Sequence, residues 1–152
     1  MAGRLAGIAH HGRKYAAMET LERVAVSVAA GVAGDHASAV ASAKSRPRRQ
    51  VSLIERGGWR AALAELGGTL EWWHSRRNFL IEDTGLPHAA GTRLQLGARL
   101  VIEITGECAP CQRMDALLPG LNDAMKPDWR GGFVGRVVRD GEVAVGDEIR
   151  IL

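Results

Sequence analysis

The second half of the sequence is a succession of short apolar runs separated by glycine-containing turns, and this pattern constrains the fold more than any other feature. Asp140-Gly141 stands between the apolar runs 132–138 and 142–145, and Asp-Gly in such a position is typical of a β-hairpin. Residues 93–96 and 99–105 form a second predicted pair of strands around Gly97. Strands this short and closely spaced favour an antiparallel sheet or barrel over a parallel one.

The first half of the sequence adds further strands and one clear helix. The runs 24–28, 50–54 and 76–81 are predicted as strands from their apolar patterning. A helix is predicted where apolar residues fall at i, i+3, i+4 and i+7, namely Trp59, Ala62, Leu63 and Leu66. Gly57-Gly58 is expected to precede this helix and Gly67-Gly68 to end it.

Two segments lack a regular pattern. Residues 3–18 are expected to be irregular, and residues 37–48 are predicted as a basic loop, because Pro47 disfavours a long helix there. We count seven or eight strands and two or three peripheral helices, which predicts a mostly β fold. The length of 152 residues fits a single domain, residues 1–152.

Composition and charge exclude several classes of protein. No run of about 18 apolar residues is present, and the N-terminus resembles no export signal, so we expect a cytoplasmic protein without a membrane partner. The net charge is +3, and 17 of the 20 basic residues are arginine. Alanine and glycine are abundant as well, which is what a G/C-rich coding sequence gives. We therefore attribute the arginine content to overall composition and expect no nucleic-acid partner.

The two cysteines form a Cys-x-Pro-Cys motif, Cys108 to Cys111, between a predicted strand and a predicted helix. That helix is expected from the spacing of Met114, Leu117, Leu118 and Leu121, although Pro119 interrupts it. Because proline suits the start of a helix, Cys111 is expected in the first helical turn. The free N–H groups of that turn and the nearby Arg113 favour the thiolate, which is the form that attacks or ligates.

Four interpretations of this cysteine pair are open from the residues alone. A zinc site would need a second ligand pair, and the five histidines show no ligand spacing. A thioredoxin-like dithiol has this spacing but lacks the βαβ context. The cysteines can instead be plain buried residues, or Cys111 can be a single reactive thiolate with Cys108 as its neighbour or resolving thiol.

Five stretches, in order along the chain, carry a family resemblance: Gly34-Asp35-His36, Arg49-Gln50-Val51-Ser52-Leu53-Ile54, Arg76-Arg77-Asn78-Phe79-Leu80-Ile81, Ile104-Thr105-Gly106-Glu107-Cys108-Ala109-Pro110-Cys111, and Arg130-Gly131-Gly132 followed by Val145-Gly146-Asp147. Together they resemble the MOSC domain, the C-terminal domain of molybdenum cofactor sulfurases, in its small stand-alone bacterial type. The resemblance covers about residue 20 to residue 152 and implies a MOSC-type β-barrel with peripheral helices.

The resemblance also implies a site. It implies that Cys111 carries sulfur or ligates molybdenum, with Arg76 and Asn78 at the cofactor and Arg77 at the variable position between them. The chemistry of arginine toward phosphate adds Arg49 as a further contact. Asn78 can equally satisfy backbone groups at a strand edge. Arginine suits the phosphate of molybdopterin and cysteine suits a soft metal, so the residue chemistry agrees.

The function that the resemblance implies is binding of the molybdenum cofactor, sulfur transport on the reactive cysteine, or both, extending to reduction of N-hydroxylated compounds. Whether the protein is a molybdenum-dependent oxidoreductase or sulfurtransferase-like is open, and the cofactor can be absent from the isolated protein. One alternative is a non-catalytic cofactor-binding or accessory module on the same scaffold. A weaker alternative is a dithiol redox switch.

The sequence departs from the family pattern at one position, and its length leads us to expect a separate protein partner. Arg or Lys often follows the early Gly-Asp in the family, whereas His36 stands here. Because 152 residues leave no room for a PLP-dependent desulfurase domain, we expect a separate cysteine desulfurase or electron-donor protein as partner. The basic run 44–49 is expected to close over a polyanionic ligand.

Overall fold

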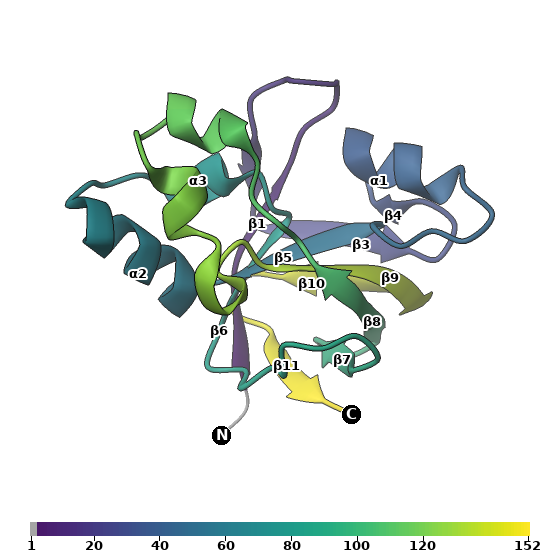
Figure 1. The fold of residues 1–152 in the computed structure, drawn as a ribbon. Coiled ribbons are helices and arrows are strands. Elements are labelled where there is room, and N and C mark those ends of the chain that lie inside the picture. The colour runs from purple at the N-terminus through teal and green to yellow at the C-terminus, as the bar shows by residue number, and fades with distance from the viewer. Residues whose placement is uncertain (1–2) are drawn as a thin grey trace.

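The computed structural model describes residues 3–152 and shows a closed barrel of seven strands with helices around it (Figure 1). The strands follow one another around the barrel in the order β11-β7-β8-β9-β5-β6-β1, and β1 pairs with β11 to close it. The bounds are β1 (Gly3–His10), β5 (Val51–Glu55), β6 (Phe79–Glu82), β7 (Arg93–Leu96), β8 (Leu100–Glu107), β9 (Phe133–Arg139) and β11 (Glu148–Ile151). All neighbours are antiparallel except β5 and β6, so the predicted mostly β, mostly antiparallel fold is confirmed.

A second, three-stranded sheet contains β3 (Arg23–Ser27), β4 (Gly31–Val32) and β10 (Gly141–Ala144), and β2 (Glu19–Leu21) extends the edge of β1. The hairpin predicted at Asp140-Gly141 is therefore wrong, because β9 stays in the barrel while β10 pairs with β3. The Asp140 carboxylate accepts the N–H of Val28 at 2.7 Å and so contacts the end of β3. Gly141 lies so close to the Leu100 backbone that a Cβ there would collide with it. At the Asp-Gly pair the chain thus passes from the barrel to the three-stranded sheet instead of making a two-strand turn.

The core has two parts because β5 and β6 are buried on both faces. Successive side chains of a strand point to opposite faces, so Leu53 and Phe79 point into the barrel while Ile54 and Leu80 point outward. The outward pair packs against Trp59 and other apolar side chains of the helical layer. Apolar residues therefore stand at successive positions in both strands, Leu53-Ile54 in β5 and Phe79-Leu80-Ile81 in β6.

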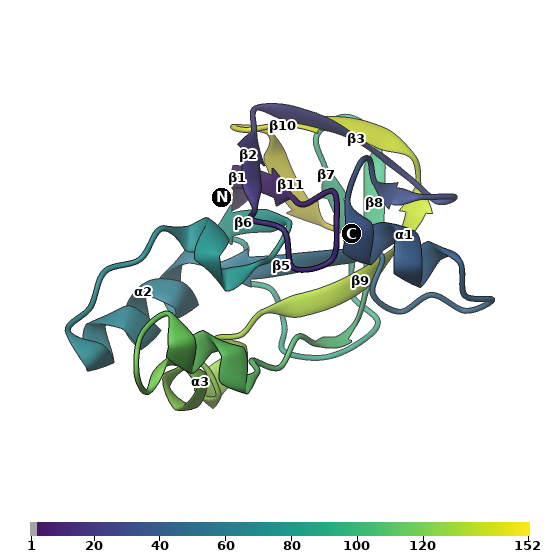
Figure 2. The same ribbon diagram turned by 90° about the horizontal axis from the view of Figure 1, so that it is seen from above.

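The helices cover opposite sides of the barrel. In both ribbon views, α2 (Arg56–Leu66) and α3 (Leu121–Ala124) lie together on one side, and α1 (His36–Ser42) lies on the other (Figures 1 and 2). The predicted helix around Trp59 is confirmed as α2, and Gly67 ends it in the left-handed conformation at φ 61°. Gly57-Gly58 lies inside its first turn and not before it. None of the helices described in residues 3–152 has the length and apolarity needed to cross a membrane.

Two predictions for the N-terminal third are wrong. The segment expected to be irregular contains β1, a central barrel strand whose Leu5 and Ile8 are fully buried. The predicted loop 37–48 begins with α1, because the Asp35 carboxylate accepts the N–H of Ser38 at 2.9 Å and caps the helix. Pro47 restricts only the residues after Ser42, where α1 ends.

Candidate functional site

A cavity of about 210 Å³ opens where the β1–β2 loop, the start of α1, the turn before β6 and the cysteine segment meet. Its walls combine one thiol with five cationic side chains and a single carboxylate. The lining residues that the argument uses are Lys14, Asp35, Arg49, Arg76, Arg77 and Cys111, together with Tyr15, Asn78 and Arg113. All five predicted site residues therefore lie around one cavity, although they come from three separate stretches of the chain.

Cys111 is exposed at this cavity, while Cys108 is only 1% exposed. Cys111 immediately precedes a 3-10 helix, η2 (Gln112–Ala116), with extended backbone at φ −124°. The helix expected from Met114, Leu117, Leu118 and Leu121 is divided into η2 and α3, and the interruption expected at Pro119 lies between them. Cys111 therefore lies outside the helical turn in which it was predicted. The positive charges around it come from side chains and not from a helix terminus.

Arg76 borders the cavity from the end of a second 3-10 helix, η1 (Trp72–Ser75). Its backbone is left-handed at φ 66°, and its guanidinium donates to the Ala16 carbonyl of the β1–β2 loop at 2.8 Å. Partial burial and the nearby Arg113 lower the pKa of Arg76, and Asp35 partly opposes this shift. The strand predicted to begin at Arg76 starts only at Phe79. Arg76 is thus a turn residue whose side chain borders the cavity.

Arg77 has a different environment and is only 5% exposed. Its Nε donates to the Gly131 carbonyl and its Nη1 to the Ser75 carbonyl, both at 2.8 Å, and Nη2 lies 3.4 Å from the Cys108 carbonyl. Burial is the main cause that lowers its pKa. Arg77 therefore holds the backbone of three segments together beneath the cavity.

Asn78 is buried and engaged with protein groups. Its Oδ1 accepts the backbone N–H of Ser52 at 3.1 Å, its Nδ2 donates to the Ala9 carbonyl at 3.2 Å, and its own N–H donates to the Ser52 hydroxyl at 3.1 Å. These bonds connect β5, β6 and β1 at the cavity wall. The observed contacts are those of the backbone-satisfying role that the sequence also allowed.

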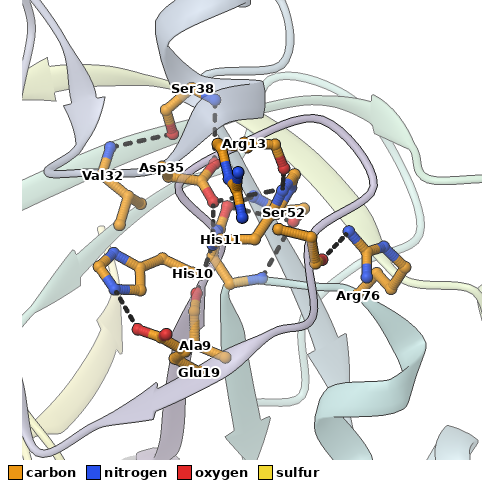
Figure 3. A network of polar contacts seen from close by, with 12 residues as sticks. Ala9, His10, His11, Arg13, Glu19, Val32, Asp35, Ser38, Ser52 and Arg76 are labelled. Carbon is orange, nitrogen blue, oxygen red and sulfur yellow. Dashed lines mark hydrogen bonds and ion pairs between the residues drawn. The ribbon is translucent and has the colours of Figure 1, made fainter.

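A polar network joins the β1–β2 loop to α1 at the rim of the cavity (Figure 3). Asp35, 3% exposed, caps α1 through Oδ2 and accepts the N–H of His11 through Oδ1 at 3.2 Å. The His11 ring lies 4.0 Å from the same carboxylate and 6.0 Å from the His36 ring. Asp35 thus positions the loop that carries Lys14 and Tyr15.

Sequence reasoning missed Lys14 and Tyr15 as site residues because they lie in the loop that showed no pattern. The Tyr15 ring is contacted by Arg113, 4.3 Å from its centroid, and by Lys14 at 5.1 Å. The basic run 44–49 does not act as one unit, because Arg49 lines this cavity while Arg46 and Arg48 line another.

The structure is thus a closed seven-strand β-barrel with an exposed thiol beside guanidinium groups. The model of the MOSC domain matches residues 11–150, and the chain belongs to the MOSC domain family. The suspected family and the barrel-type fold are thereby confirmed.

Solved structures agree with this fold. The YUAD protein of Bacillus subtilis is 22% identical, with a TM-score of 0.74 over 98% of this chain and 94% of its own. YiiM from Geobacillus stearothermophilus is 15% identical, with a TM-score of 0.74 over 99% and 75%. YiiM from Escherichia coli is 14% identical, with a TM-score of 0.70 over 98% and 69%. Comparison with curated proteins gives no significant match.

Proposed function

We propose that this protein binds the molybdenum cofactor and that Cys111 is the protein ligand of the metal. The observation that carries the proposal is the exposed thiol of Cys111 in the same cavity as Arg49, Arg76, Arg113 and Lys14. A soft sulfur ligand beside several phosphate-binding cations is the donor set that a phosphorylated, metal-bearing cofactor needs.

The donor set also fits a cofactor better than a bare metal ion. Within residues 3–152, no group of three His, Cys, Asp or Glu side chains is placed to hold a metal. A metal at Cys111 must therefore bring other ligands with it, and the pterin of the molybdenum cofactor supplies two sulfurs. When bound, the cofactor would supply two-electron redox chemistry.

The chain's own residues then have distinct roles. Arg49, Arg76 and Arg113 would bind the phosphate, since guanidinium groups match its oxygens in pairs. Arg77 and Asn78 position the Cys111 segment and the cavity wall through their bonds to backbone groups. Proton and substrate contacts of a reductase acting on N-hydroxylated compounds would be made at the open side, where Tyr15 is 64% exposed.

Sulfur transport on Cys111 is the second function that an observation supports, because Cys111 is the exposed thiol and Cys108 is buried. In this step the Cys111 thiolate attacks the outer sulfur of a persulfide on a desulfurase partner. A persulfide forms on Cys111, and the partner's cysteine leaves as a thiolate. Cys108 is 1% exposed, so an external oxidant or a partner thiol would meet Cys111 first.

The test is metal and pterin analysis of protein made in a host that synthesises the cofactor. Wild-type protein should carry molybdenum and pterin. Cys111→Ser should retain at least about tenfold less of both, since losing even an outer-shell partner of a metal ligand typically lowers metal affinity about 10–100-fold. The matched control is Cys108→Ala, which removes the buried thiol and should retain the cofactor. Equal molybdenum in Cys111→Ser and wild type contradicts the proposal.

The same samples separate the remaining alternatives. A mass increase of one sulfur atom on Cys111 after incubation with a cysteine desulfurase and cysteine identifies a sulfur carrier, whether or not molybdenum is found. Turnover of an N-hydroxylated compound with an electron donor identifies a reductase. Cofactor retention without turnover identifies the accessory module.

A further inference from the structure

A second and larger cavity, of about 770 Å³, lies on the other side of the basic segment 43–49. Arg46, Pro47 and Arg48 of this segment face β8 and β9, where the wall is formed by Glu103, Ile104, Thr105, Arg136 and Val137, with Val28 at one end. It shares no lining residue with the Cys111 cavity. The two cavities are therefore lined by different residues.

Side-chain hydrogen bonds connect the walls of this cavity. Thr105 donates its hydroxyl to the Arg48 carbonyl at 2.5 Å, and Arg48 Nη2 lies 3.4 Å from the Thr105 carbonyl. Gln50, 2% exposed, donates to the Val28 carbonyl at 2.8 Å and accepts the N–H of Val137 at 2.9 Å. Side-chain bonds of this kind fix the segment against the barrel, so the cavity is formed before any ligand arrives.

The side chains that line this cavity carry a net positive charge. Three guanidinium groups line it against one carboxylate, Glu103, which already accepts bonds from Arg136 at 3.0 Å and Arg93 at 3.1 Å. Among residues 3–152, no acidic side chain pairs with Arg46 or Arg48. Arg46 and Arg48 therefore have no acidic partner within these residues, and the contact of Arg48 Nη2 with the Thr105 carbonyl leaves its other N–H groups for an anion.

Part of the remaining surface is apolar, beside the polar side chains of Ser45, Gln50 and Thr105. Val28, 50% exposed, and Pro47 flank the opening, and Ile104 and Val137 close its inner end. An apolar body placed there would cover the exposed Val28 side chain and lose contact with water. Glu103 disfavours a ligand carrying two negative charges more than one carrying a single charge.

We propose that this cavity is a second ligand site, for a carboxylic acid with an apolar body. Arg46 and Arg48 bind the carboxylate, and Val28 and Pro47 contact the body. The volume suits a ligand larger than a simple anion. The proposal does not depend on cofactor binding at Cys111.

Isothermal titration calorimetry with octanoate, octyl phosphate and octan-1-ol tests this assignment. Octanoate should bind wild-type protein, and Arg46→Gln and Arg48→Gln should each weaken it about tenfold or more, since a hydrogen-bonded ion pair is lost. Val28→Asp, which places a carboxylate at the opening, should abolish binding. Arg150→Gln, an exposed arginine that lines neither cavity, is the matched control and should bind like wild type.

Three results would overturn the proposal: octan-1-ol binding as tightly as octanoate, unchanged affinity in both cavity arginine variants, or octyl phosphate binding more than about tenfold tighter than octanoate. Circular dichroism and melting of each variant exclude misfolding as the cause of a loss. Cys111→Ser should bind octanoate like wild type, which keeps this result independent of the cofactor experiment.

Discussion

Replacing Arg77 by methionine removes the buried guanidinium that fixes the cysteine segment. The carbonyls it binds belong to η1 at Ser75, to the end of β8 at Cys108 and to the turn before β9 at Gly131. Methionine has a similar length but donates no hydrogen bond, so it leaves these carbonyls without their donor. The variant therefore tests whether Arg77 is a structural clamp or a ligand contact.

The magnitude comes from the two short bonds at 2.8 Å. A hydrogen bond from a charged donor contributes about 1.5–3 kcal/mol, so two contribute about 3–6 kcal/mol. Removing a buried ion returns part of its desolvation cost, the same cause that lowers the pKa of Arg77. We therefore expect Arg77→Met to lower the free energy of unfolding by about 3 kcal/mol, equivalent to a fall in Tm of about 6–12 °C for a domain of this size.

Urea unfolding followed by tryptophan fluorescence measures this difference, with Arg150→Met as the exposed control that should stay within about 0.5 kcal/mol of wild type. A second measurement is thiol labelling of the native protein. Cys108 is 1% exposed and should react only in Arg77→Met, where its carbonyl is released. A variant with wild-type stability and an unreactive Cys108 would refute the clamp.

Two further predictions concern stability. Gly132 has φ +104° and a Cβ there would collide with the Leu53 carbonyl, so Gly132→Ala should lose about 3 kcal/mol or more in a thermal melt, whereas Gly57→Ala, with open space around it in α2, should not lose stability. Hydrogen bonds from Arg136 and Arg93 lower the pKa of Glu103. The contribution of Glu103 to the free energy of unfolding is therefore complete above its unfolded-state pKa of about 4.3. This contribution is lost as the pH falls through the lowered pKa of the folded state. Because water still reaches the Glu103 carboxylate and screens its ion pairs, urea unfolding of wild type and Glu103→Gln should differ by at most about 1 kcal/mol at neutral pH and converge in acid, and a difference that grows on acidification would contradict this.

The sequence predicted the fold where local pattern and tertiary structure agree. The pairing of β7 with β8 and the helix α2 have strong local patterns, and both are present. β1 was missed because its run Gly3–His10 is central in the barrel and buried along most of its length, so it lacks the alternation that indicates a half-exposed strand. The hairpin at Asp140 failed because no local rule states that a chain leaves one sheet for another.

In the candidate site, too, the sequence predicted residues that belong to a motif and missed roles that depend on tertiary contacts. Cys111, Arg76 and Arg49 came from motifs, and the structure places them around one cavity. The distinction between Arg76 and its buried neighbour Arg77 had no local pattern, since it depends on backbone carbonyls more than 30 residues away in the chain. Asp35 could have been found, because an aspartate before a run of small residues is a common helix N-cap.

The charge of the Cys111 cavity depends on where cations point and not on which motif supplies them. His36 replaces the basic residue often found after Gly-Asp in the family, and it is absent from the cavity walls. Lys14 and Arg113, from the β1–β2 loop and from η2, line the cavity instead, and each contacts the Tyr15 ring. Attraction between a thiolate and a cation depends on their separation and on the surrounding dielectric, so cations contributed by other elements serve equally well. The cations beside Cys111 therefore come from the β1–β2 loop and η2, and not from a helix terminus or from the residue after Gly34-Asp35.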